Sequence, residues 1–147
     1  MTVRQNHGFS YLEMLVVISV LMMVVAISVP FYQNTLTRVE EKNFFRLLEQ
    51  DMLWLQSASI TSIKKPKFVI FPDQNFYELF EGADKLIIRR SYPSSIKVTL
   101  ETFKIPFYFS SSGVPSQPGT FTVSIGQQKF KVTFPFGKGR FYVTKQT

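Results

Sequence analysis

An apolar run from Phe9 to Val29 restricts the fold of this chain more than any other feature of its sequence. At about 1.5 Å of rise per residue, a helix over these 21 residues is about 31 Å long, close to the hydrocarbon thickness of a bilayer. Its single charged side chain is Glu13, and a carboxylate inside a membrane helix is costly. The sequence therefore predicts a long apolar helix that keeps one acid near its start for a function.

Other interpretations of the run compete with this one. A secretory signal peptide cut after Ser28 leaves both Glu13 and the helical pattern beyond Pro30 unexplained. An ordinary signal anchor would place Glu13 at headgroup depth. A buried helix of a soluble protein is disfavoured by so long a run with a single charge. The first two interpretations stay open at this point.

Charge before the run predicts a membrane topology. Arg4 is the only full charge there, and basic residues favour the cytoplasmic side of a span. We therefore expect a single-pass protein of the cell membrane with a cytoplasmic N-terminus and an extracytoplasmic head, which reaches the cell surface after assembly.

Composition excludes several kinds of chemistry. The 147 residues include no cysteine, and the one histidine, His7, precedes the apolar run. If residues 1–8 are removed, no histidine or cysteine remains for a catalytic triad or a metal site. Gly137-Lys138-Gly139 lacks the spacing of a phosphate-binding loop, so a turn between strands is expected there. We expect no catalytic residue, metal or cofactor, and no enzyme activity.

The pattern becomes amphipathic after Pro30, where a kink or short melt is expected. Charged residues fill the positions between apolar ones that recur every three or four residues, as in a helix with one face on a sheet. The apolar positions are Leu36, Val39, Phe44, Leu47, Leu48, Met52, Leu55 and Ala58. The helix is expected to continue to about Ser59 and to end by Lys64-Lys65-Pro66.

Past residue 66 the period changes to two, which predicts short strands. They are expected at Lys67–Phe71, Phe76–Phe80, Lys85–Arg90, Ile96–Leu100, Ile105–Phe109, Thr120–Ile125, Lys129–Phe134 and Arg140–Thr144. The clearest hairpin runs from Thr120 to Phe134. Short connections favour antiparallel pairing, so the sequence predicts an α+β fold.

Residues 8–13, Gly-Phe-Ser-Tyr-Leu-Glu, resemble the class III signal of type IV pilins and pseudopilins. The resemblance implies that a prepilin peptidase cuts between Gly8 and Phe9 and methylates the new amine of Phe9. Glu13 becomes the fifth residue of the mature chain, where the family keeps a glutamate. Pro30 falls where many pilins carry a helix-bending proline. In assembly, Glu13 would neutralise the N-terminal amine of a neighbouring subunit.

The same resemblance implies a type IV pilin-like architecture, with a long N-terminal helix whose membrane-spanning first half precedes a part packed on a C-terminal antiparallel sheet. We expect a leader at 1–8, a transmembrane and filament-core helix at 9–30, an amphipathic helix at 31–63 and an antiparallel β head at 64–147.

Charge is distributed unevenly along the chain. Residues 9–84 hold 6 basic and 9 acidic side chains, whereas residues 85–147 hold 10 basic and 1 acidic. Strand alternation places Lys97, Lys129, Lys131 and Arg140 opposite the apolar set, so they should form a solvent face that could contact DNA or another anion. A merely solvated face that discourages edge-to-edge aggregation is the alternative.

Three segments of the head loosely resemble the ComGD-like group of minor competence pseudopilins: Phe107–Gly113, Pro118–Thr120 and Gly139–Tyr142. This implies a minor subunit of a DNA-uptake type IV pilus. Its partners would be the prepilin peptidase, other pilin subunits, an assembly ATPase, a membrane platform protein, the membrane itself and DNA. A type II-like secretion pseudopilin and a secreted basic binding module remain alternatives.

Overall fold

The structure, a computed structural model, describes residues 10–146, with side chains for all of these except 28–36. One helix, α1 (Tyr11–Thr61), is followed by seven strands and a short 3-10 turn, η1 (Pro72–Gln74). The chain divides into two compact units, Met1–Arg38 and Val39–Thr147, which are described separately. The α1 backbone is helical through Pro30, so the local melt expected at this residue is absent.

The first unit contains the N-terminal part of α1. From Tyr11 to Ile27 its large apolar side chains are between 47% and 82% exposed. Glu13 lies in the first turn. This part of the helix therefore presents apolar surface that no described residue covers.

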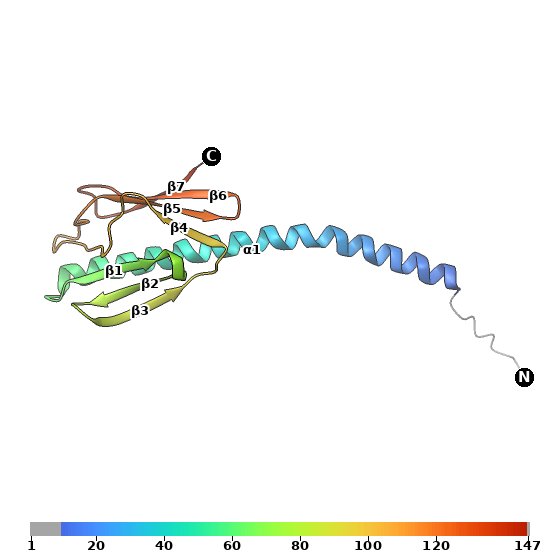
Figure 1. Cartoon of the computed structure of the whole chain (residues 1–147), viewed down its shortest axis with the longest axis horizontal. Coiled ribbons are helices and arrows are strands. Elements are labelled where there is room, and N and C mark those ends of the chain that lie inside the picture. The colour runs from blue at the N-terminus through green and yellow to red at the C-terminus, as the bar shows by residue number, and fades with distance from the viewer. Residues whose placement is uncertain (1–9, 147) are drawn as a thin grey trace, which may run out of the picture. The chain divides into compact units, whose positions relative to one another are not determined.

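The second unit contains two antiparallel sheets rather than the one sheet expected, and both lie along the C-terminal part of α1 (Figure 1). The first consists of β1 (Pro66–Phe71), β2 (Phe76–Glu81) and β3 (Lys85–Ser91), in that order. The second consists of β4 (Ile96–Leu100), β5 (Gly119–Ile125), β6 (Gln128–Phe134) and β7 (Tyr142–Gln146), also in order. The predicted α+β fold, with a helix packed on antiparallel strands, is confirmed.

The core between α1 and the sheets is built largely from phenylalanine. Helix residues Phe44, Leu48, Met52 and Leu55 are at most 4% exposed, and their spacing of three or four places them on one face. A ring cluster faces them, with centroids 4.7–5.2 Å apart along the series Phe121, Phe103, Phe107 and Phe134. The aromatic-rich sequence thus supplies a core without any disulfide.

The β5–β6 hairpin is present as predicted, with Thr120 opposite Thr133 and Val123 opposite Phe130. The strand expected at Ile105–Phe109 is absent. That segment makes only isolated bridges, between Phe68 and Phe107 and between Phe109 and Pro115. Pro106 has no N–H to give to a ladder, which explains why the alternating pattern does not become a strand.

The expected single-pass location in the cell membrane is wrong. Within the part of the chain that the structure describes, no helix combines the length and the apolar character needed to cross a bilayer.

A buried carboxylate joins α1 to the first sheet. Asp51 is 3% exposed and accepts a hydrogen bond of 2.7 Å from the Tyr77 hydroxyl. The Arg90 guanidinium donates to it through Nε at 3.0 Å and through Nη2 at 3.2 Å. Burial and the Asp51 hydrogen bond raise the pKa of Tyr77, so its hydroxyl stays a donor. These bonds fix the side of α1 that faces β2 and β3.

Asp51→Ala should lower the free energy of unfolding by about 2–4 kcal/mol, because it leaves the Tyr77 hydroxyl and the Arg90 guanidinium without their acceptor. Urea denaturation of the full chain measures this. Glu49→Ala removes an exposed acid from the same helix and should change stability by less than about 0.5 kcal/mol. Equal effects of the two substitutions would show that the buried carboxylate contributes nothing.

Candidate functional site

The predicted cleavage residues, Gly8 and Phe9, lie outside the described residues, and so does the side chain of Pro30. Glu13 is described, and it is exposed in the first turn of α1. It has no hydrogen bond or ion pair with any described residue. Its neighbours Tyr11 and Leu12 are 82% and 70% exposed. On this apolar helix surface the carboxylate therefore has no partner among the described residues.

Three of the four predicted basic residues lie on one face of the second sheet. Lys97 is opposite Ser124 on β5, and Ser124 is opposite Lys129 on β6. Lys131 is two residues further along β6, on the same face as Lys129. Phe130 lies between these two lysines in β6 and Val132 follows Lys131, and both are buried on the other face. The alternation of the sequence places these three lysines as expected.

Arg140 lies elsewhere. The final strand begins at Tyr142 rather than at Arg140, so Arg140 belongs to the connection before β7. It lines a hollow of about 130 Å³ with helix residues that include Glu49, Leu53 and Gln56. The structure therefore does not bring Arg140 into the same face as the three lysines.

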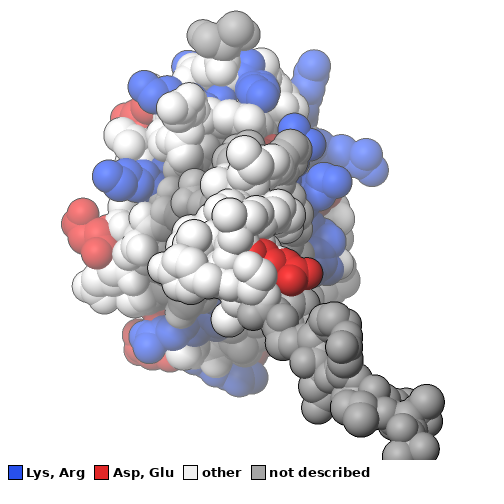
Figure 2. Space-filling view, turned by 90° about the vertical axis from the view of Figure 1, so that its right-hand side faces the viewer, with Lys and Arg blue, Asp and Glu red and all other residues white. Residues whose placement is uncertain are grey.

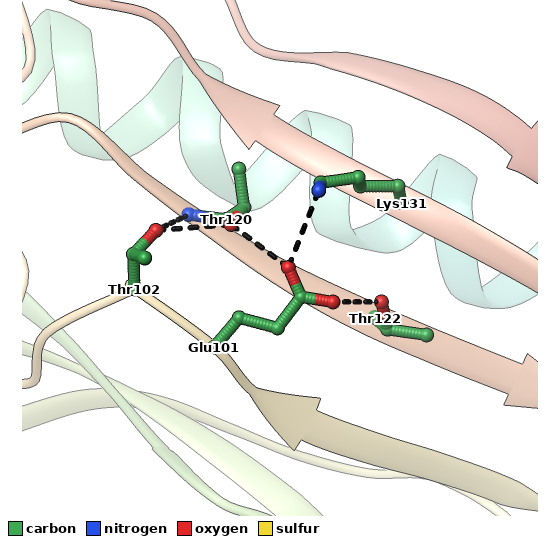
Figure 3. Close-up of polar contacts among 5 residues, drawn as sticks. All are labelled: Glu101, Thr102, Thr120, Thr122 and Lys131. Carbon is green, nitrogen blue, oxygen red and sulfur yellow. Dashed lines mark hydrogen bonds and ion pairs between the residues drawn. The ribbon is translucent and has the colours of Figure 1, made fainter.

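A polar cluster on the lysine-bearing face was missed by the sequence interpretation (Figure 3). Glu101 accepts hydrogen bonds from the Thr122 hydroxyl at 2.6 Å and from the Thr120 hydroxyl at 3.0 Å. Its carboxylate also lies 3.4 Å from Nζ of Lys131. Bonds from Thr122 and Thr120 hold the pKa of Glu101 below its ordinary value. Glu101 is the one acid of residues 85–147, and it stands among threonines in the sequence. This isolated acid was the signal from which the polar cluster could have been predicted.

The cluster weakens the predicted basic face. Glu101 partly neutralises Lys131, so Lys97 and Lys129 carry most of the positive charge of this face. Figure 2 shows Lys and Arg side chains at several places around the edge of the view rather than gathered in one patch.

Metal coordination finds no support in the described side chains. Residues 10–27 and 37–146 contain no group of three or more His, Cys, Asp or Glu side chains placed to hold a metal. The candidate features that remain are an unpaired acid on an apolar helix and a polar sheet face. Both suit contacts with other macromolecules.

The fold is similar to a solved structure, the minor pseudopilin EpsH from the type 2 secretion system of Vibrio cholerae. The match has a TM-score of 0.56 and 18% sequence identity, and it covers 72% of this chain and 97% of that one. The protein therefore has a type IV pilin-like fold, and this match gives no support to the finer expectation of the ComGD-like competence group. No family model and no curated protein matches the sequence.

Glu101→Gln should weaken the sheet slightly, by about 0.5 kcal/mol at pH 7, because the cluster is partly exposed. A pKa lowered in the folded state means that the unfolded chain binds more protons in acid. The contribution of Glu101 is therefore present above the unfolded value of 4.5 and is lost as the pH falls through the folded value.

Thermal melts of the full chain between about pH 3 and 7 test this pH dependence. Glu101→Gln should flatten the acid side of the curve relative to the parent chain. Asp84→Asn, at an exposed turn acid, serves as the matched control. Parallel curves for Glu101→Gln and the parent would contradict the role of the cluster.

Proposed function

We propose that this protein is a minor pilin-like structural subunit of a competence type IV pilus for DNA uptake. It is assembled after a prepilin peptidase removes residues 1–8 and methylates the amine of Phe9. The observation that carries the proposal is the exposed carboxylate of Glu13, which has no partner among the described residues, in the first turn of an apolar helix. The type IV pilin-like fold supports the same class of function.

Glu13 acts between subunits in this proposal. Cleavage creates a cationic amine four residues before it, about one helical turn away. In a bundle of staggered apolar helices, the carboxylate of one subunit neutralises the amine of the next. A paired charge is less costly there than two isolated ones. Interaction of Glu13 with its own helix dipole adds about 0.3–1 kcal/mol, but several first-turn positions would provide it equally.

The proposed partners follow from this assembly. Other pilin or pseudopilin subunits contact the apolar part of α1, whose described side chains are largely exposed. The prepilin peptidase acts once, on the precursor. An assembly ATPase and a platform protein act on the filament as a whole.

A pseudopilin of a type II-like secretion system is the second candidate, and the likeness to a secretion-system pseudopilin favours it. Deletion of the chain separates the two: loss of transformation supports the first, and loss of exoprotein secretion supports the second. A secreted basic module is the remaining alternative. Mass spectrometry of the mature N-terminal peptide distinguishes it, because methylated Phe9 supports a pilin and a start at Val29 supports the module.

Glu13→Ala should leave precursor cleavage intact and abolish incorporation into filaments, because the amine of the neighbour loses its partner. Immunoblots of whole cells and of a sheared-filament fraction measure the two steps. Gly8→Val should instead leave an uncut precursor. Glu41→Ala, at another glutamate of the same helix, should behave as the parent. Normal filament levels of the Glu13→Ala chain would refute the electrostatic role.

DNA contact is a separate part of the proposal and rests on the lysine-bearing face of the second sheet. Charge reversal at Lys97 and Lys129 together should abolish a gel shift of duplex DNA by the full chain. The salt dependence should show a slope of about 0.9 per phosphate contact. Reversal at Lys138 and Arg140 changes net charge equally but leaves this face intact. Equal losses in both double variants, or no shift at low salt, would contradict the assignment.

A further inference from the structure

A groove of about 910 Å³ opens where three segments meet at the C-terminal end of α1. They are the end of the helix with the residues that follow it, the β2–β3 turn at Gly82–Ala83, and the segment from Tyr108 to Ser116. Figure 1 shows these segments at the same end of the second unit. The volume lies within the range of about 300–1,000 Å³ typical of small-ligand sites.

Several polar groups of the groove are already used within the protein. The Ser59 hydroxyl donates to the Leu55 carbonyl at 2.8 Å. Ser110 Oγ lies 2.8 Å from Ser112 Oγ and binds Val114. The ammonium of Lys67 donates to the Ala83 carbonyl and lies 4.9 Å from the centroid of the Phe80 ring. These groups shape the walls and are not available to a ligand.

A second set of polar groups in the groove is not bonded to other described residues. The side chains of Lys65, Tyr108, Ser111 and Ser116 line the groove and form no hydrogen bond or ion pair with any described residue. Lys65, Ser111 and Ser116 are exposed, and Tyr108 is half-buried. Ile63, which also lines the groove, is fully exposed. The free set therefore combines three hydroxyls, one cation, an aromatic ring and an aliphatic side chain.

We propose that this groove binds an acidic oligosaccharide. Serine and tyrosine hydroxyls both donate and accept, which matches the hydroxyls of a sugar ring. The Tyr108 ring and Ile63 offer apolar surface to the C–H faces of the sugars. The Lys65 ammonium pairs with a carboxylate on the glycan through a charge-assisted hydrogen bond.

The charge around the groove favours a glycan over a nucleic acid. Lys65 is the one cation lining it without a partner among the described residues. Nearby, Glu81 is paired with Lys85 at 2.8 Å, and Asp84 is exposed in the β2–β3 turn. DNA binding usually relies on several phosphate contacts, whereas a sugar needs many hydroxyl contacts and few charges. The proposal does not depend on the function proposed for Glu13.

Calorimetric titration of the full chain in non-ionic detergent tests the proposal. The probes are a hyaluronan hexasaccharide, the neutral N-acetylglucosamine hexamer, and a 12-nucleotide single-stranded DNA. We expect saturable binding of the hyaluronan hexasaccharide and at least tenfold weaker binding of the neutral hexamer. Lys65→Gln should reduce the affinity for the acidic sugar about tenfold, to the level of the neutral one. Ser111→Ala combined with Ser116→Ala should weaken both sugars.

Lys138→Gln removes an exposed lysine outside the groove and should leave all affinities unchanged. Thermal melts of each variant identify any loss of folding. The proposal is overturned if neither sugar binds at millimolar concentration, or if Lys65→Gln and the serine variant bind the acidic sugar as the parent does. Binding of the DNA probe without binding of the sugars would also overturn it, and loss of that DNA binding in Lys65→Gln would assign the groove to a nucleic acid.

Discussion

Burial of one face of α1 against two sheets is the constraint on which the second unit depends. Phe44, Leu48, Met52 and Leu55 enter a core of phenylalanine rings, and full burial of each such side chain contributes about 1.5–3 kcal/mol. The residue between two of them, Asp51, is polar yet equally buried. Its bonds to Tyr77 and Arg90 stabilise this rotation of the helix, because burial of the carboxylate without these donors would be costly.

The same helix also positions the connections at the edge of the second sheet. Nε2 of Gln56 donates to the carbonyls of Gly113 at 2.6 Å and of Gly139 at 2.8 Å. A Cβ atom at Gly139 would lie 2.6 Å from this nitrogen, so a side chain there would displace the amide of Gln56 from these two bonds. Because residue 139 is held against α1, the last strand begins only at Tyr142 and Arg140 stays near the helix. The amide side chain of Gln56 thus fixes the position of Arg140 and also holds part of the loop that lines the groove.

The parts of the fold that could be predicted from the sequence depend on local periodicity. The amphipathic pattern around Leu48 and Leu55 and the alternation across Thr120–Phe134 each report which face is buried, and the structure agrees. Asp51 is one of the charged positions between the apolar ones, and the periodicity does not show its burial because its partners are 26 and 39 residues away. The prediction of a strand at Ile105–Phe109 was wrong because the alternating pattern takes no account of the missing backbone N–H at Pro106. The charge of Glu13 was visible, but whether it meets an amine depends on a second chain.

The excess of basic residues along the chain is larger than the excess that the folded surface presents. Residues 85–147 hold ten cations and one acid, but three of the cations pair with acids from earlier in the chain. These pairs are Lys85 with Glu81, Arg89 with Glu78, and Arg90 with Asp51. Lys131 pairs with Glu101 as well.

The cations outside these pairs are all exposed: Lys97, Lys104, Lys129, Lys138, Arg140 and Lys145. Of these, Lys97 and Lys129 share the solvent face of the second sheet, on opposite sides of Ser124. Two unpaired lysines across a central strand would contact one or two phosphates, not a long stretch of duplex. A single head would therefore bind DNA weakly and only at low salt, and repetition of the subunit along the proposed filament would strengthen that binding.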